Sequence, residues 1–285
     1  MSNKIQPISE LPLPPPIGKR NLTLACSVTE SHLKEFLLLK FSAELFHECE
    51  WFISCDDFCF NYLEMNYDNC RCANLDLQNG KVFGNEEEIS NFYGVIDGKF
   101  RAVEAAIKAR GECLLVDSDI IFCGEFEGAS PDVDASICPH YQWDLSMDRA
   151  WGIYNVGFVY IRSLEFLKAW EEETKSGNYQ FEQVPIQVVA HSGKFRCQQF
   201  SISHNMGWWR FNSEEKKFRI LSFNIWNDAV TYDGSFVSSF HFHSFVPCHH
   251  SKPFKKFVFN DLLSRTQSGN KIISEYNRLL LWSAH

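Results

Sequence analysis

The most restrictive feature of the sequence is a short apolar run that ends in two aspartates. Residues 113–116 read Cys-Leu-Leu-Val, and Asp117, Ser118 and Asp119 follow before apolar residues resume at 120–122. A continuous apolar run of this kind predicts a strand that is buried on both faces, as the strands of parallel sheets are. Carboxylates bracketed by apolar residues are costly unless a partner compensates their charge. We therefore expect a buried strand to deliver both aspartates into one polar site.

Segments of strand type and helix type alternate along the chain. Apolar strands are expected at 22–27 and 51–54, and helices at 99–110 and around 164–175. The stretch 58–96, which is rich in Asn and Asp, predicts loops and short pieces. The alternation predicts an α/β fold with a mainly parallel central sheet. In such sheets ligands bind beyond the carboxyl ends of the strands.

Composition narrows the classes of function. The net charge is −9 and no basic run occurs, which disfavours nucleic acid and anionic membrane surfaces as partners. The 11 cysteines include no Cys-x-x-Cys pair and predict free thiols in a reducing compartment, so we expect a cytoplasmic location. No signal-peptide core and no apolar run long enough for a membrane span is found. Residues 1–20 predict an extended Pro-rich tail, and residues 21–285 a single domain with a helical segment at about 255–285.

The spacing of the two aspartates suits a divalent cation. Side chains two residues apart in an extended chain point to the same side, and two close carboxylates stay ionised only beside a counter-charge. A hard cation such as Mn²⁺ or Mg²⁺ supplies that charge and binds carboxylate and phosphate oxygens. Two other interpretations are a strand-end turn with solvated aspartates and a haloacid dehalogenase-like phosphatase with Asp117 as its nucleophile. In that phosphatase class the motif lies near the start of the chain, whereas here it follows residue 116.

The stretch 111–122, Gly-Glu-Cys-Leu-Leu-Val-Asp-Ser-Asp-Ile-Ile-Phe, resembles the nucleotide-sugar glycosyltransferases of the GT-A type. It is most similar to the retaining family that includes glycogenin and bacterial lipopolysaccharide galactosyltransferases. The resemblance implies a single Rossmann-like GT-A domain, with a mainly parallel mixed sheet flanked by helices. It also implies that Asp117 and Asp119 chelate a manganese ion that holds the donor diphosphate, with Ser118 beside the donor.

Two downstream matches follow in the order typical of this family. Asn155 and Gly157 precede an apolar strand, and the resemblance implies that Asn155 lies beside the donor sugar. Glu182 and Gln183 stand where the family has Asp-Gln, which implies that Gln183 lies near the reacting carbon. Glu182 is one methylene longer than the usual aspartate. The residues alone also fit a turn at Asn155 with a tight bend at Gly157, and an exposed polar pair at 182–183.

A histidine-rich segment near the C-terminus supplies the third metal ligand in this interpretation. His241 and His243 share one face of a strand, and either is expected to reach the metal. The family ends its core with such a histidine and then a Lys-Pro-aromatic motif, whose lysine contacts the donor phosphate; here that lysine is Lys252. The alternative is zinc binding by the local histidines and Cys248, although their spacing matches no compact zinc motif.

Further donor and acceptor contacts are predicted from their positions in the chain. Lys99, at the expected start of a helix, matches a basic residue that the family places near the donor, and Arg101 is the competing candidate for this position. The first two predicted strands are expected to contact the nucleotide through Ala25, Ser27, Asp56 and Asp57. Aromatic rings stack on sugars but also pack in cores. The candidate acceptor contacts are Asp144, Trp208 and Trp209.

Together these features predict a metal-dependent enzyme that moves a hexose from a nucleoside-diphosphate sugar, with UDP-sugars favoured, to a glycan or other hydroxyl acceptor. Retention of configuration is implied by the resemblance alone. Inversion needs a carboxylate base beside the acceptor, for which Asp144 and Glu182 are available. The remaining alternative is a chain that has lost turnover and only binds a nucleotide sugar or a glycan.

Overall fold

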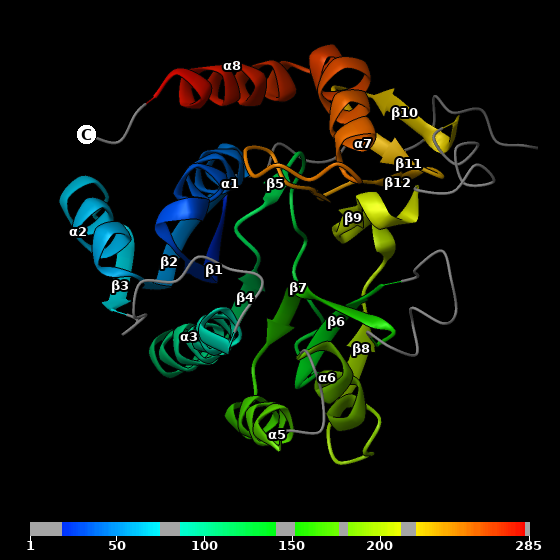
Figure 1. The fold of residues 1–285 in the computed structure, drawn as a ribbon. Coiled ribbons are helices and arrows are strands. Elements are labelled where there is room, and N and C mark those ends of the chain that lie inside the picture. Colours follow the sequence, from blue (N-terminus) through cyan, green and yellow to red (C-terminus); the bar gives the residue numbers. More distant parts are fainter. Residues whose placement is uncertain (1–18, 75–85, 141–151, 177–181, 212–220, 283–285) are drawn as a thin grey trace, which may run out of the picture.

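A seven-stranded mixed sheet forms the centre of the molecule, with the strand order β3-β2-β1-β4-β7-β6-β8 (Figure 1). The computed structural model describes residues 19–74, 86–140, 152–176, 182–211 and 221–282. β1 to β4 run parallel, β7 is antiparallel to β4 and β6, and β8 is parallel to β6. This arrangement confirms the predicted mainly parallel mixed sheet. The strands are β1 Arg20–Val28, β2 His47–Cys55, β3 Cys70–Asn74, β4 Cys113–Val116, β6 Ala135–Pro139, β7 Tyr154–Ile161 and β8 Cys197–Gln199.

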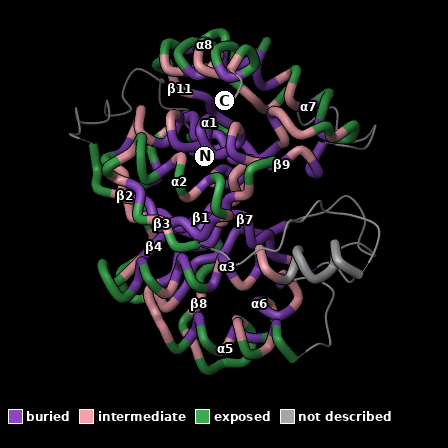
Figure 2. The backbone as a smooth tube through the Cα atoms, turned by 60° about the vertical axis from the view of Figure 1, so that its left-hand side comes forward, coloured by how far each residue is buried: buried purple, intermediate pink, exposed green. Residues whose placement is uncertain are grey.

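Helices cover both faces of this sheet because its central strands are apolar on both sides. In β1, Leu24 and Cys26 point into the core that contains α1, whereas Ala25 points into the core that contains α3, α5 and α6. Figure 2 shows buried strands between helices whose outer sides are exposed. The fold is therefore the predicted α/β class. The helices named here are α1 Leu33–Phe46, α3 Glu86–Arg110, α5 Leu164–Lys175 and α6 Gln183–Ala190.

Two three-stranded sheets accompany the main sheet. β5 (Ile120–Phe122) follows β4 and pairs antiparallel with β13 (Ser239–His241), which itself pairs in parallel with β9 (Met206–Gly207). The register places Ile120 opposite His241, so the strand after Asp119 and the strand that carries a candidate histidine are direct neighbours. The other small sheet consists of β10 Phe223–Trp226, β11 Ala229–Tyr232 and β12 Ser235–Phe236.

The C-terminal helices close one side of the fold. α7 (Lys252–Phe257) precedes α8 (Gln267–Leu281), which packs against α1. Ile272 and Leu279 of α8 are buried in the same core as Leu24 of β1. A helix with the length and apolar character needed to cross a membrane is not found among the described residues.

The stretch 58–96 differs from the expectation of loops and short pieces. α2 (Asp57–Asn66) and β3 occupy part of it, and α3 begins at Glu86, well before the expected start at Lys99. β3 forms because it pairs with β2 along its whole length, although three of its five residues are exposed. Pairing with a neighbour that is distant in sequence therefore overrides the polar composition.

α2 begins directly after the acidic residue Asp56, which follows β2. The Asp56 side chain accepts a hydrogen bond of 2.9 Å from the backbone N–H of Cys59 and so caps the helix. Cys59 and Leu63 lie one turn apart and are buried on the inner side of α2. The Asp-rich stretch is thus the start of a helix rather than a loop.

Candidate metal and donor site

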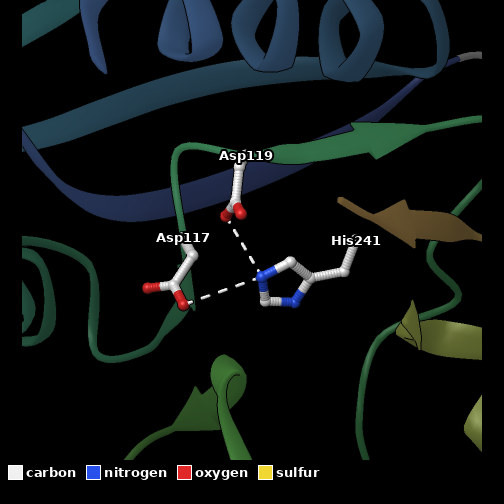
Figure 3. A group of neighbouring side chains, drawn as sticks. All are labelled: Asp117, Asp119 and His241. Atoms are coloured by element: carbon white, nitrogen blue, oxygen red, sulfur yellow. Dashed lines mark ion pairs between the residues drawn. The ribbon is translucent and has the colours of Figure 1, made fainter. Parts of the chain in front are cut away.

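The strands bring Asp117, Asp119 and His241 together, as Figure 3 shows. Asp117 directly follows β4, where its backbone N–H donates to the carbonyl of Gly157 at 2.9 Å. Asp119 directly precedes β5, and the β5–β13 pairing carries His241 beside it. The Nε2 atom of His241 lies 3.1 Å from Asp119 Oδ1 and 3.9 Å from Asp117 Oδ2.

These three side chains fit a hard divalent cation. Each offers one ligand atom, and the three atoms lie within 4.8 Å of one another. Within the described part of the chain this is the one cluster of three or more metal-ligating side chains, so a zinc site built on the other histidines and Cys248 is not formed there. Two carboxylates and an imidazole suit Mn²⁺ or Mg²⁺ in ligand type.

Gly157 makes the close approach of these ligands feasible. A Cβ atom at this position would lie 2.5 Å from His241 Cε1 and 2.6 Å from Asp117 Oδ2. Both distances are shorter than any van der Waals contact between such atoms. The missing side chain therefore leaves room for the imidazole and the carboxylate to face the same point, as a shared cation requires.

The pKa values of Asp119 and His241 show that opposite charges are favoured next to each other in this cluster. Burial acts to raise the pKa of Asp119, but the imidazoles of His241 and His243 hold that pKa below its usual range. Burial acts to lower the pKa of His241, but Asp119 raises it above its ordinary value. His243 Nδ1 lies 3.0 Å from Asp119 Oδ2. The aspartates thus favour the charged form of His241 when no metal compensates their charge.

Lys99 forms ion pairs with both Asp117 and Glu182. Its Nζ lies 2.8 Å from Asp117 Oδ1 and 3.0 Å from Glu182 Oε1, with 13% of its side chain exposed. Burial acts to lower the pKa of Lys99, but the two carboxylates raise it above its ordinary value. Lys99 therefore stays charged at the edge of the candidate metal site. The competing residue Arg101 pairs instead with Asp97 at 2.7 Å.

Of the other predicted catalytic residues, Asn155 is linked to His241 through Asn205, and Glu182 is linked to Asp117 through Lys99. Asn155, at the start of β7, is buried and accepts a hydrogen bond from the Gly157 N–H at 3.0 Å. Glu182 is the buried N-cap of α6, where its carbonyl accepts from Trp170 Nε1 at 2.9 Å. Gln183 is the first residue of α6, and its Oε1 is buried without a hydrogen-bond partner among the described residues.

The predicted nucleotide contacts are placed less uniformly. Both carboxylate oxygens of Asp56 are engaged, since Oδ2 accepts from the Glu30 N–H at 2.6 Å while Oδ1 caps α2. Asp57 is exposed and bonds Asn74. Ala25 is buried inside β1, and Ser118 is partly exposed between the two aspartates. The hydroxyl of Ser27 is buried and lacks a partner in the described residues.

The predicted phosphate and acceptor contacts differ in accessibility. Lys252 is exposed at the first position of α7 and forms no ion pair with another described residue. Trp209 is buried, and its ring packs edge-on against His140 and His241, with centroids 5.0 and 4.9 Å away. Trp208 is half-buried and stacks on His250. Asp144 lies outside the described residues.

Three residues near the cluster were not predicted. Asn205 accepts from His241 Nδ1 at 3.2 Å. The imidazole of His32 is close enough to Asp119 and His243 for their charges to act on its pKa, which burial lowers. Glu35 is buried on α1, and its carboxylate accepts from the backbone N–H groups of residues 244–246 at 2.8–3.0 Å. None of them belongs to a periodic or spaced motif; only contacts between distant segments reveal them.

Comparison with known proteins places the fold. No protein-family model matches the sequence, and no curated protein matches it. The structure is similar to the galactosyltransferase LgtC in complex with donor and acceptor sugar analogues, with a TM-score of 0.56, 10% identity, and coverage of 92% of this chain and 98% of that chain. An active-site mutant of LgtC matches with a TM-score of 0.54 at 10% identity, over 92% of this chain and 98% of that chain.

A third solved structure is similar over part of its length. The bifunctional glycosyltransferase WbbM in its apo form matches with a TM-score of 0.50 at 9% identity, over 92% of this chain and 53% of that chain. At such identities the likeness concerns the path of the backbone. The chain therefore has the GT-A fold of these nucleotide-sugar glycosyltransferases.

Proposed function

We propose that the chain is a metal-dependent glycosyltransferase that takes a hexose from a nucleoside-diphosphate sugar, with UDP-sugars favoured, to a hydroxyl acceptor such as a glycan. One observation carries the proposal: within a GT-A fold, Asp117, Asp119 and His241 place three ligand atoms within 4.8 Å of one another. In α/β sheets ligands bind beyond the carboxyl ends of the strands. Asp117 directly follows the end of β4, and its position therefore suits a donor diphosphate.

Mn²⁺ or Mg²⁺ held by these residues would act as a Lewis acid toward the departing diphosphate. Lys99 contributes a buried positive charge beside Asp117, and so favours phosphate oxygens over neutral ligands in the site. Lys252 is exposed, and in this proposal it contacts the diphosphate from the solvent side. His243 contacts Asp119 but is not part of the three-ligand cluster, and we therefore propose His241 as the third metal ligand.

Gln183, Glu182 and Asn155 are the proposed residues around the sugar. The buried Oε1 of Gln183 has no hydrogen-bond partner among the described residues and is an acceptor that a sugar hydroxyl can satisfy, since buried polar atoms are rarely left without a hydrogen bond. Glu182 is neutralised by Lys99 and therefore serves better to orient the sugar than as a free base. In the transfer, the bond from the anomeric carbon to the diphosphate breaks, a bond to the acceptor oxygen forms, and the acceptor proton passes to an oxygen of the departing diphosphate. We propose that configuration is retained.

The same reasoning extends to organisation and location. The core cluster runs from Leu24 of β1 to Leu279 of α8, which supports one domain over residues 21–285. All cysteines of the chain are free thiols in the structure, which supports a reducing compartment such as the cytoplasm. A phosphatase or a purely binding role has no comparable support, because the solved structures cited above are glycosyltransferases.

A donor screen tests the proposal. Thermal unfolding and slow donor hydrolysis are measured for UDP-, GDP- and dTDP-sugars, with and without Mn²⁺. We expect a metal-dependent shift for UDP-sugars that Asp119→Ala abolishes, whereas the exposed Asp261→Ala serves as a matched control and keeps the shift. The proposal fails if no nucleotide sugar raises the melting temperature in either condition. Hydrolysis of a simple phosphate ester that is lost in Asp117→Asn would favour the phosphatase. Binding of a donor without turnover would favour the non-enzymatic role.

A further inference from the structure

A buried chain of hydrogen bonds connects the candidate metal ligand His241 to the backbone of β7. His241 Nδ1 lies 3.2 Å from Asn205 Oδ1, and Asn205 Nδ2 donates to Asn155 Oδ1 at 2.8 Å. The same Asn155 oxygen accepts from the Gly157 N–H at 3.0 Å. Asn205 is fully buried, and Asn155 and His241 are each 6% exposed. Water therefore does not compete for these groups.

The direction of every bond in this chain follows from its last member. The Gly157 N–H can only donate, so the Asn155 atom that faces it is the carbonyl oxygen. The Asn205 atom that faces this oxygen is then the amide nitrogen, and the other end of Asn205 is an acceptor. His241 Nδ1 must consequently carry a proton. In a neutral imidazole this leaves a lone pair on Nε2, the atom that faces Asp117 and Asp119.

β7 is irregular at this point. The pairing of β6 with β7 shifts between Ile137 and Cys138, which pair with Val159 and Asn155 respectively. Residues 156–158 consequently have no partner in β6. The irregularity thus coincides with a backbone donor whose direction cannot be reversed. Such irregularities are common beside functional sites.

We propose that Asn205 is a positioning residue that fixes His241 in the tautomer with a proton on Nδ1, so that Nε2 is free to bind the metal. This inference rests on the proposed metal site. Without Asn205, the neutral ring gains more from a proton on Nε2, which donates to Asp119 Oδ1 at 3.1 Å and occupies the ligand lone pair. Partners of this kind behind a metal-binding histidine typically contribute about 10–100-fold in metal affinity.

The test compares Asn205→Leu, which removes both hydrogen bonds at similar volume, with Asn205→Asp, which keeps an acceptor for Nδ1. Binding of Mn²⁺ alone is measured by titration calorimetry. We expect Asn205→Leu to bind Mn²⁺ about 10–100-fold more weakly, and Asn205→Asp to recover most of that loss. Asn69→Leu is the control, because Asn69 donates to Glu44 and to the Cys49 carbonyl elsewhere in the fold. It should leave Mn²⁺ affinity unchanged.

Nitrogen NMR of the histidine ring gives a readout that needs no variant to fold. In the wild-type protein with Mg²⁺, we expect His241 to show a proton on Nδ1 and none on Nε2. A proton on Nε2 of His241 overturns the proposal. The proposal also fails if Asn205→Leu binds Mn²⁺ as tightly as the wild-type protein, or if Asn205→Asp binds Mn²⁺ as weakly as Asn205→Leu. If the wild-type protein binds neither Mn²⁺ nor Mg²⁺, the proposed function fails instead.

Discussion

Gly157→Ala is the substitution that tests the candidate metal site most directly. The new Cβ would lie 2.5 Å from His241 Cε1 and 2.6 Å from Asp117 Oδ2. Ordinary contact begins near 3.4 Å, so the imidazole and the carboxylate must each withdraw by several tenths of an ångström. Metal–ligand distances vary by only about 0.2 Å between sites. One methyl group should therefore prevent both ligands from binding the same ion.

The expected effect can be expressed as a loss of metal-induced stabilisation. Overpacking by itself costs about 1–3 kcal/mol of stability. At a Mn²⁺ concentration 100 times its dissociation constant, the metal stabilises the wild-type protein by about 2.7 kcal/mol. If affinity falls about 100-fold, the same concentration stabilises Gly157→Ala by only about 0.4 kcal/mol. For a chain of this size about 2–4 °C corresponds to each kcal/mol, so the Mn²⁺ shift should fall from about 5–10 °C to about 1–2 °C.

Thermal unfolding with and without Mn²⁺ measures this difference, and Gly124→Ala is the matched control. A Cβ at Gly124 would lie 2.7 Å from the Val237 carbonyl oxygen, so it also overpacks, but it meets no candidate ligand. It should lower the melting temperature and keep the full Mn²⁺ shift. If Gly157→Ala keeps the wild-type Mn²⁺ shift in melting temperature, Asp117, Asp119 and His241 do not share one ion.

Three further predictions concern groups around the site and in the core. Lys99→Gln leaves Glu182 and Asp117 without their positive partner and should lower the free energy of unfolding by about 3 kcal/mol. Urea denaturation in metal-free buffer measures this change. Unchanged stability would mean that the two ion pairs contribute nothing. Burial lowers the pKa of His47 from 6.5 to about 4. Between pH 7 and pH 5 the unfolded state therefore binds a proton at this histidine that the folded state does not bind, and the free energy of unfolding should fall by about 2 kcal/mol. His47→Gln should lose this part of the acid sensitivity. Glu35→Ala removes the acceptor of three N–H groups and should accelerate hydrogen exchange at 244–246, whereas unchanged exchange there would show that another contact holds the segment.

Local sequence patterns predicted the parts of the site that lie on single segments. The apolar run of β4 placed Asp117 and Asp119 at the end of a buried strand, as found. Asp56, by contrast, was assigned to the nucleotide, yet both of its oxygens bind backbone N–H groups. A capping aspartate and a ligand-binding aspartate look alike in sequence, since each follows a strand and precedes polar residues.

Contacts between distant segments account for what the sequence left open. His241 and His243 are equivalent by alternation along a strand, and only the register of β13 against β5 brings Nε2 of His241 between the aspartates. Asn205 precedes a two-residue strand and carries no signal of its own. Register and pairing of distant strands depend on the packing of the whole fold, which a single sequence does not express as a local pattern.

The position of His241 on β13 sets the time during synthesis at which the candidate metal site can form. β1 to β4 and their helices emerge from the ribosome first and can begin to pair, since domains are made from the N-terminus at about 5–20 residues per second. β13 is the middle strand between β5 and β9, and it arrives much later. Until then the nascent protein carries two aspartates without their histidine and exposes the edges of β5 and β9. Translation therefore completes the small sheet and the candidate metal site in the same event, and a chain released before residue 239 should lack the third candidate ligand and be prone to association through its open strand edges.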